Sequence, residues 1–522
     1  MESRGAAKAV SLMMIIMLAG KALGLVRDSM AGSYFGTASV EGTAFNYASV
    51  IPRQFMDVMF ASAISASFIP VFNEQLTNRG KKKAFALAHN FISVILAAST
   101  VFTALCIVFA PQIITIYDGG KNLEAIPLAS SLIRLMFVII ILSCVAFSLT
   151  GVLQSLGEFN APAAMGLVSN AIILVYFFFF MDRFGVFGLC AAYVLGWAAQ
   201  VMIQLPFLIK SHFGFRFKIN LEDESLRQIG VLMIPVMVST WVGPVNVLVN
   251  GKAALTDARG MEAFNAITYA NTLYTVISGV FVLSLANVLF PKLSVLAAQN
   301  DDKGFVETLS STVRALFFFL IPMSAGLMAL AVPIVRVVYE RGQFDALSTT
   351  LTSDALIYFS AGICGFGLQT IMTRAFYAMR DGKTPVITST LAIAANLVLS
   401  YVLIKPLGVG GPAAASSISI TAAGVIMLCV LNRRYKNMLN TILAIDLVKM
   451  FLLGGATFGV AYSLRVAIER LGDSLAIKLL SLAVPMVAGS AGYFALALIF
   501  RLPEARMGLE AVKRIIAKYR RQ

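Results

Sequence analysis

The sequence predicts an all-α polytopic membrane protein of about 14 transmembrane helices, arranged as two parallel six-helix lobes followed by two C-terminal helices. Of the 522 residues, 59% are hydrophobic and only 13% are charged, and the mean hydropathy is +0.84. This composition excludes a soluble globular enzyme, a disordered protein and a disulfide-stapled secreted domain. The helix count follows from the length, because one span with its loop takes roughly 35 residues.

Apolar runs long enough to cross a bilayer recur along the whole chain. The first run contains Lys21 and Arg27-Asp28 and has no small-residue cleavage motif, so we expect a retained span rather than a signal peptide. The predicted spans are 8–35, 43–75, 84–117, 124–153, 160–181, 186–209, 229–251, 261–292, 305–338, 346–375, 385–404, 408–431, 444–466 and 477–500.

Loop charge predicts the orientation of these spans. With the N-terminus inside, about 26 Lys and Arg fall on the inner side and about 10 on the outer side. The positive-inside rule therefore accounts for the net charge of +15 without a nucleic-acid partner. Both termini are expected in the cytoplasm. The basic segment 501–522 has apolar residues at helical spacing, which favours a helix lying on an anionic leaflet over a solvated tail.

An internal repeat with a shift of 219 to 223 residues relates the two halves. Each copy holds about six spans, an even number, so both copies share one orientation and are related by an axis along the membrane normal. Facing lobes would enclose a central cavity. The predicted domains are an N-terminal lobe (1–217), a C-terminal lobe (218–437), two added helices (438–500) and a basic cytoplasmic tail (501–522). Four anchors carry the repeat: Ala44-Phe45-Asn46 with Ala263-Phe264-Asn265, Pro70 with Pro291, Pro162 with Pro385, and Gly185 with Gly408.

Motifs of catalysis and metal binding are not found in the sequence. The five cysteines lie in apolar stretches without a CxxC or metal-ligand spacing, and His89 and His212 lie far apart. There is no phosphate-binding P-loop, no HExxH motif and no nucleophile elbow. We therefore predict no enzyme activity and no cofactor, apart from a possible coupling cation.

Charged residues embedded in the first two spans are the main candidates for function, because an ionisable side chain in lipid needs a cavity or a partner. Lys21 and Asp28 are two helical turns apart and share a face, with Arg27 beside them, and Arg53 and Asp57 are spaced i, i+4. If both helices line one cavity, the three basic side chains form a patch suited to phosphate or pyrophosphate. The alternative is that Arg27–Asp28 and Arg53–Asp57 are ion pairs that hold helices together.

Other embedded polar residues are weaker candidates. Arg134 and Arg314 are flanked by apolar sequence, and snorkelling to an interface is favoured over a ligand role. Near the end of the seventh predicted span, Asn246, Asn250 and Lys252 either face a cavity or sit at helix–helix contacts.

Several motifs resemble those of the MurJ (MviN) lipid II flippase family, and the resemblance covers nearly the whole chain. It implies the fold of the multidrug/oligosaccharidyl-lipid/polysaccharide exporter superfamily, with a lipid-tail groove at the two extra helices. It also implies alternating access that turns lipid II from the inner to the outer leaflet of the bacterial cytoplasmic membrane, and cell-wall synthesis proteins as further partners. The matching runs are Gly24-Leu25-Val26-Arg27-Asp28, Phe68-Ile69-Pro70-Val71, Leu232-Met233-Ile234-Pro235-Val236, Tyr339-Glu340-Arg341-Gly342-Gln343-Phe344-Asp345 and Phe376-Tyr377-Ala378-Met379-Arg380-Asp381-Gly382-Lys383-Thr384-Pro385.

The resemblance implies a substrate-binding role for Lys21, Arg27 and Asp28, and the chain departs from the family at other positions. The family's acid before Ala-Phe is Thr43 here, with Glu41 nearby as a substitute. Its double arginine falls on Met56 and Asp57, with Arg53 one turn away, and its Asp-Arg pair is Asn271-Thr272, for which Lys252 is the nearest replacement. The departures leave open another lipid-linked oligosaccharide as cargo, and the missing arginine of the second lobe leaves open a non-transporting scaffold of the cell-wall machinery. A cation-coupled multidrug exporter of the same superfamily is a further alternative, which the net basic charge of the embedded residues disfavours.

Overall fold

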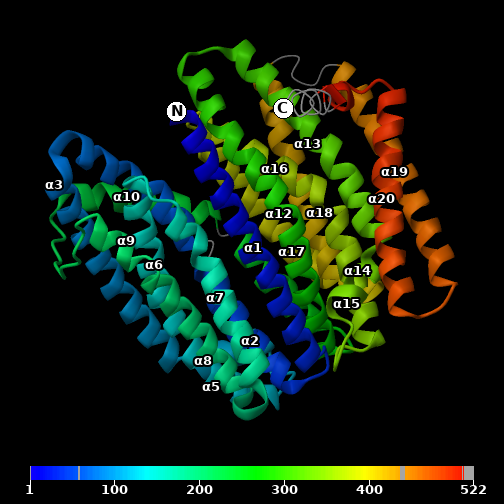
Figure 1. Ribbon diagram of the computed structural model, residues 1–522, viewed down its shortest axis with the longest axis horizontal. Helices are drawn as coiled ribbons and strands as arrows, with labels where there is room; N and C mark the ends of the chain where they lie inside the picture. The colour runs from blue at the N-terminus through cyan, green and yellow to red at the C-terminus, as the bar shows by residue number, and fades with distance from the viewer. Residues whose placement is uncertain (1, 57–58, 241, 436–440, 508, 511–522) are drawn as a thin grey trace. The chain divides into compact units, whose positions relative to one another are not determined.

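The computed structural model describes residues 2–56, 59–240, 242–435, 441–507 and 509–510, and the regular elements in these ranges are α-helices (Figure 1). This confirms the predicted all-α class. Contacts divide the chain into unit 1 (Met1–Leu248, Ala258–Asn265 and Arg341–Phe344) and unit 2 (Val249–Asp257, Ala266–Glu340 and Asp345–Gln522). The predicted domain boundaries at residues 217, 437 and 500 stay predictions.

Unit 1 is built from the first ten helices and the first residues of the eleventh and twelfth. Within it, α1 packs on α7, α2 on α5, α7 on α8, and α3 on both α6 and α10. The helices are α1 (Glu2–Phe35), α2 (Val40–Met56), α3 (Met59–Val108), α4 (Ala110–Asp118), α5 (Ala125–Met136), α6 (Val138–Ser155), α7 (Asn160–Phe179), α8 (Met181–Met202), α9 (Leu205–Lys210), α10 (Glu224–Thr240) and α11 (Val242–Ala254).

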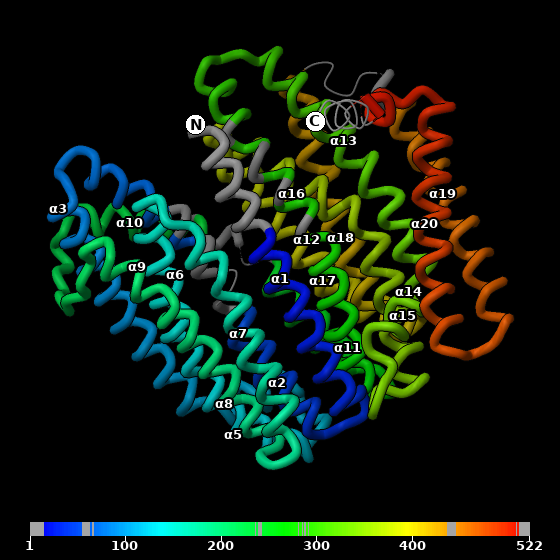
Figure 2. The backbone as a smooth tube through the Cα atoms, in the orientation of Figure 1, coloured from blue at the N-terminus to red at the C-terminus, as the bar shows by residue number. Residues whose placement is uncertain are grey.

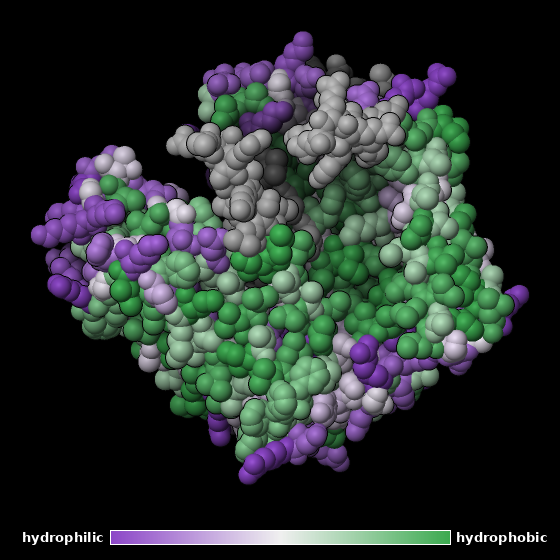
Figure 3. Space-filling model, in the orientation of Figure 1, coloured by the Kyte–Doolittle hydropathy of each residue, from purple (hydrophilic) through white to green (hydrophobic). Residues whose placement is uncertain are grey.

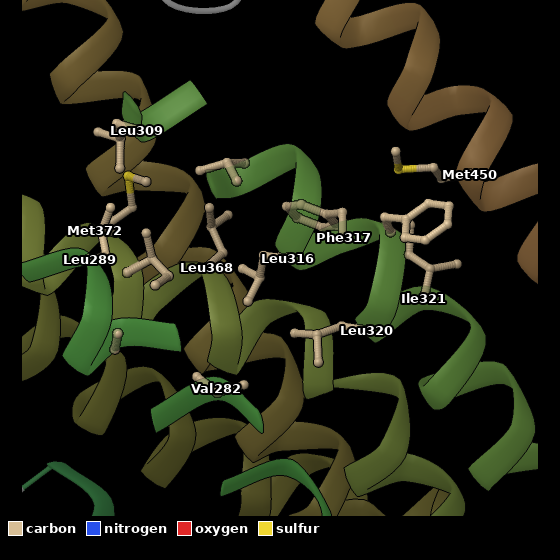
Figure 4. Close-up of a cluster of buried hydrophobic side chains, with 14 of the residues drawn as sticks. Val282, Leu289, Leu309, Leu316, Phe317, Leu320, Ile321, Leu368, Met372 and Met450 are labelled. Carbon is tan, nitrogen blue, oxygen red and sulfur yellow. The ribbon is translucent and has the colours of Figure 1, made fainter. Parts of the chain in front are cut away.

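Unit 2 contains most of the remaining helices, and Figure 2 shows α19 and α20 running side by side at its edge. Buried side chains from α12, α13, α16, α18, α19 and α20 form its core, part of which is drawn in Figure 4. The helices are α12 (Gly260–Ala298), α13 (Asp302–Ala329), α14 (Ala331–Tyr339), α15 (Ala346–Ala361), α16 (Ile363–Ala378), α17 (Lys383–Leu407), α18 (Gly410–Arg434), α19 (Thr441–Glu469) and α20 (Leu475–Ile499).

The described part of the chain has ten helices that are long and apolar enough to cross a membrane, or eleven if the bent pair α15 and α16 counts as one span. These helices cover most of the predicted spans. The predicted spans 8–35, 43–75 and 229–251 coincide with α1, with α2 and the start of α3, and with α10 and α11. The described residues of these three segments do not meet the criteria of length and hydropathy that the ten helices meet.

Glycines with positive φ separate neighbouring spans. Gly80 (φ 79°) breaks α3 within the basic segment Arg79–Lys83, between the predicted spans 43–75 and 84–117. Gly185 (φ 56°, ψ −149°) breaks α8 after its first turn, and Gly408 (φ 52°, ψ −135°) adopts a similar conformation between α17 and α18. This region favours glycine because it has no Cβ. The shift of 223 residues that relates the two glycines in the sequence therefore also relates their backbone geometry.

Asp118 ends α4 as a buried carboxylate that accepts four hydrogen bonds. Its Oδ1 accepts from the Tyr47 hydroxyl and from Asn122 Nδ2, both at 2.7 Å. Its Oδ2 accepts from the backbone N–H groups of Lys121 (2.7 Å) and Asn122 (2.9 Å). Burial alone would raise the pKa of Asp118, but these hydrogen bonds to the charged form outweigh it and lower the pKa below its usual value.

We expect Asp118→Asn to destabilise unit 1 by about 1–3 kcal/mol, because either orientation of the amide turns an NH₂ group toward two donors. The contribution of Asp118 is present at pH 7 and lost as the pH falls through the lowered pKa of the folded state. The melting temperature of the detergent-purified chain should therefore fall on acidification more steeply for the parent than for the variant. Parallel pH curves for the two proteins would contradict this account.

Candidate functional site

A cavity of about 330 Å³ lies within unit 1. Helices α1, α2, α5, α6, α7 and α8 supply its walls, and among the described residues its lining includes two arginines and no carboxylate. Its polar and aromatic lining could bind an anion together with a sugar or an amide. The residues are Arg27, Ser49, Pro52, Arg53, Met136, Ile139, Phe147, Pro162, Met165, Gly166, Ser169, Asn170, Ile173, Tyr193, Trp197 and Gln200.

Arg27 is held in the cavity wall by partners on two helices. Its Nη1 donates to Asn170 Oδ1 on α7 at 2.8 Å, and its Nε and Nη2 donate to Asp28 Oδ1 at 2.9 and 2.7 Å. The guanidinium carbon also lies 5.5 Å from the centre of the Tyr193 ring, a cation–π contact. The side chains of Arg27 and Asp28 are each only 16% exposed. Both expectations for Arg27 therefore apply, since it is ion-paired and also faces a cavity.

Close packing of α1 on α7 brings Asn170 to Arg27. A Cβ at Gly20 would lie 3.1 Å from the Leu167 backbone nitrogen, and one at Gly24 would lie 3.2 Å from Asn170 Nδ2. Glycine at both positions lets the helices approach closely. The Asn170 amide in turn donates from Nδ2 to the Gly20 carbonyl at 2.9 Å. One side chain therefore fixes both the helix contact and the arginine.

The other predicted basic residues of the first two spans differ in position. Arg53, near the end of α2, lines the cavity with Arg27. Lys21 is exposed on α1 and is not among the lining residues, although the same signal in the sequence had singled it out. Asp57, the predicted partner of Arg53, lies outside the described residues. Two of the three predicted cations therefore meet at one cavity.

At the start of α2, Thr43, which replaces the family's acid, is buried, whereas the nearby Glu41 is exposed. Asn265 Nδ2 donates to Thr43 Oγ1 and to the Thr37 carbonyl, both at 2.8 Å, and Asn46 Nδ2 donates to Asn265 Oδ1 at 2.8 Å. Glu41 is exposed in the first turn of α2 and does not line the cavity. A neutral hydrogen-bond network therefore occupies this position.

In unit 2, the candidates on α11 lie near a buried amide pair. Asn250 Oδ1 accepts from Asn396 Nδ2 on α17 at 3.0 Å and from the Ser400 hydroxyl at 3.4 Å. Lys252 is half-buried on the same helix. Within the described residues, no three His, Cys, Asp or Glu side chains lie close enough to hold a metal ion.

A second cavity, of about 570 Å³, lies within unit 2 and is strongly apolar. Helices α13, α14, α19 and α20 form most of it, so the two added helices make one wall. An apolar groove of this kind suits a hydrocarbon chain. Its lining residues are Ile277, Phe318, Phe319, Pro322, Met323, Gly326, Leu327, Leu330, Ile334, Thr457, Ala461, Leu482, Pro485, Met486, Gly489, Ser490, Tyr493 and Phe494.

Ion pairs connect the helices of this groove at both of its ends. One helical turn before Phe318, Arg314 of α13 contacts Glu504 at 2.6 Å and Asp446 of α19 at 3.8 Å. Arg314 is therefore ion-paired rather than simply snorkelling. Beyond Ile334, a second cluster joins α14, α19 and α20 through Arg336–Glu340 (3.4 Å), Arg336–Glu469 (3.3 Å), Arg465–Glu469 (3.2 Å) and Lys478–Glu340 (3.3 Å).

The neutral residues of the unit 1 cavity were not predicted from the sequence. Asn170, Gln200 and Trp197 line the cavity, and Trp197 packs edge-on against Phe147 with ring centres 5.8 Å apart. Asn170 and Gln200 are polar residues inside apolar spans, so the rule that selected the embedded charges would have found them if it had been applied to amides.

The many apolar helices, the cationic cavity and the separate apolar groove define a polytopic helical membrane transporter. A family model described as lipid II flippase MurJ matches residues 31–477, and the chain belongs to this family. A probable lipid II flippase MurJ of Treponema pallidum is 27% identical over 428 residues, which cover 80% of this chain and 79% of the relative. A relative with the same description from Bdellovibrio bacteriovorus is 25% identical over 517 residues, or 97% and 96% of the two chains.

Solved structures support the same fold. A lipid II flippase MurJ in an inward closed conformation aligns with a TM-score of 0.77 at 23% identity and covers 94% of this chain and 98% of its own. An inward-facing multidrug resistance MATE family transporter of the MOP superfamily aligns with a TM-score of 0.69 at 14% identity, covering 82% of this chain and 99% of its own. The predicted superfamily fold is therefore confirmed.

We expect Asn170→Asp to weaken anion binding in the unit 1 cavity by roughly tenfold or more, about 1.4 kcal/mol. The carboxylate keeps an acceptor for Arg27 but gives the guanidinium a second negative neighbour, which competes with an anionic ligand. The measurement is calorimetric titration of the purified chain with inorganic pyrophosphate, with a melting curve to establish folding. Unchanged affinity in a folded variant would show that the charge of Arg27 does not act on the ligand.

Proposed function

We propose that the chain turns lipid II, an undecaprenyl-pyrophosphate-linked disaccharide peptide, from the inner to the outer leaflet of the bacterial cytoplasmic membrane. The observation that carries the proposal is the cavity with Arg27 and Arg53 in a chain of the lipid II flippase family. Two guanidinium groups suit a pyrophosphate, since each offers planar, bidentate hydrogen bonding to phosphate oxygens. Transport proceeds by alternating access, with binding from the inner side and release on the outer side.

Each cavity takes a different part of this cargo. The arginines bind the pyrophosphate, while Asn170, Gln200 and Trp197 offer amide and aromatic groups of the kind that bind sugars and peptides. The polyprenyl tail lies in the apolar groove of unit 2, where it avoids contact with water. Both termini lie in the cytoplasm, as the distribution of basic loops favours.

Drug export, as in the MATE family, would call for a different cavity. A cationic drug needs carboxylates, whereas the part of the unit 1 cavity lining that the structure describes includes two arginines and no carboxylate. The same lining suits the pyrophosphate of other lipid-linked oligosaccharides, so competition between such lipids and lipid II tests the headgroup preference.

Either the membrane potential or a cation gradient drives transport, and imposing each one separately on proteoliposomes decides between them.

We expect Arg27→Glu to abolish complementation of a flippase-depleted strain while the protein still reaches the membrane. The new carboxylate repels the pyrophosphate and places a second acid beside Asp28. The direct readout is cleavage of lipid II by a toxin added from outside, which should fail in cells that carry only the variant. Arg183→Glu is the matched control, since Arg183 is exposed beside Phe184 and does not line the cavity. Normal growth with Arg27→Glu would contradict the proposal.

We expect Gly326→Phe to block the groove and slow lipid II transport at least about tenfold without loss of folding. A Cβ at Gly326 has no atom within 4 Å, so the ring can extend into the groove, and replacing a helical glycine favours the helix. The control is Gly459→Phe, because Gly459 is exposed on α19, is equally unobstructed and does not line the groove. Equal transport by both variants in proteoliposomes would rule out this site for the tail.

A further inference from the structure

The segment between α9 and α10 forms an extended strap that lies along α3. Backbone N–H groups of every second residue donate to side chains of α3: Arg216 to His89 Nδ1 (3.4 Å), Lys218 to Ser93 Oγ (2.9 Å) and Asn220 to Asn90 Oδ1 (2.8 Å). Asn90 Nδ2 also donates to the Asn220 carbonyl at 2.7 Å. These contacts hold the strap straight although it is not part of a sheet.

The strap has one apolar and one basic face. Side chains alternate in direction along an extended backbone, so residues 215, 217, 219 and 221 share a face. They are Phe215 (46% exposed), Phe217 (64%), Ile219 (45%) and Leu221 (71%). The opposite face carries Arg216, Lys218 and Asn220, all exposed. A row of large apolar side chains that the described chain leaves uncovered marks an interaction surface.

The strap and the neighbouring end of α3 are basic. Residues 210–221 include three basic side chains and no acidic one. Lys81, Lys82 and Lys83 are exposed on α3, just beyond the break at Gly80. Figure 3 shows hydrophilic side chains gathered over this end of unit 1. Three acids, Glu222, Asp223 and Glu224, follow the strap where α10 begins, and Asp223 Oδ1 accepts there from the Ser225 N–H group at 2.9 Å.

The level of the strap follows from α3 and α4. Residues 84–117 contain no Lys, Arg, Asp or Glu, and counted back from Asp118 at 1.5 Å per residue, the roughly 30 Å hydrocarbon layer takes about 20 residues. Ser93 therefore lies just beyond the boundary of that layer, and Lys83 lies about 15 Å further toward water. The strap contacts α3 between His89 and Ser93, so it lies at headgroup depth. Water there can satisfy the backbone groups on its open edge.

We propose that the strap, residues 214–221, binds anionic phospholipids of the leaflet at this face, with its apolar side chains in the acyl boundary and Arg216 and Lys218 on headgroup phosphates. Continuity supports this occupant, because Ile209 of the adjoining α9 is 72% exposed and extends the apolar face. Charge complementarity supports it as well, because the phosphates meet basic residues on both the strap and α3. The proposal does not depend on the identity of the transported lipid.

Hydrogen–deuterium exchange of the full chain tests the proposal in nanodiscs of phosphatidylglycerol and of phosphatidylcholine. Amides of 214–221 should exchange at least about tenfold more slowly in phosphatidylglycerol. Arg216→Gln with Lys218→Gln should remove this difference. The control variant, Lys121→Gln with Arg183→Gln, removes the same amount of charge from exposed positions elsewhere in unit 1. It should keep the difference in exchange rate between the two lipids. Phe217→Ser with Ile219→Ser should remove protection in both lipids, and melting curves establish that each variant is folded.

Equal exchange of the parent strap in both kinds of nanodisc would overturn the proposal. Protection that appears only in native membranes would also overturn it, because the occupant would then be another protein pairing with the open edge of the strap. If the variant Arg216→Gln with Lys218→Gln still exchanges more slowly in phosphatidylglycerol than in phosphatidylcholine, the basic face does not recognise headgroup charge. This result would also contradict the proposal. That double variant alters only exposed side chains, so its result stands even where the apolar variant fails to fold.

Discussion

A guanidinium inside an apolar layer must exchange its water for fixed partners, and this requirement shapes unit 1. Arg27 is satisfied by Asp28 on its own helix and by Asn170 on α7. The Asn170 amide also binds the α1 backbone at Gly20, so the helix contact and the charge depend on the same residue. Helix packing therefore positions the Arg27 guanidinium at the cavity, so that a ligand can bind without prior reorganisation of this side chain.

The fold could be predicted from the sequence largely because lipid imposes few choices on a backbone. Apolar length fixes the helices, and the recurrence of Gly185 at Gly408 with similar backbone angles shows that the repeat has a structural counterpart. The site was only partly predictable. Embedded charge selected Arg27 and Arg53, which line the cavity, but it selected Lys21 equally, and hydropathy does not say which side of a helix faces a cavity.

The neutral residues of the site could not be predicted from the resemblance, because this chain uses other chemistry at those positions. Thr43 replaces an acid and binds the Asn265 amide, while the nearby Glu41 is exposed. Asn170 has no motif of its own, and its role depends on two glycines of α1 that lie about 150 residues earlier in the chain. Contacts of such long sequence separation follow from packing and not from local pattern.

The two units hold their helices together through contacts of different charge. In unit 1, Arg27 donates to Asn170 on α7, whereas in unit 2 the Asn250 side chain accepts from Asn396 on α17. An amide pair costs less to bury than a guanidinium, since neither partner is charged. The contact in unit 2 therefore joins two helices without burying a charge. In unit 2 the ion pairs lie instead at the ends of the apolar groove, where they leave its lining free for a hydrocarbon chain. Divergence of the repeat has therefore separated the two properties that an amphiphilic cargo requires, with the cationic cavity in one unit and the apolar groove in the other.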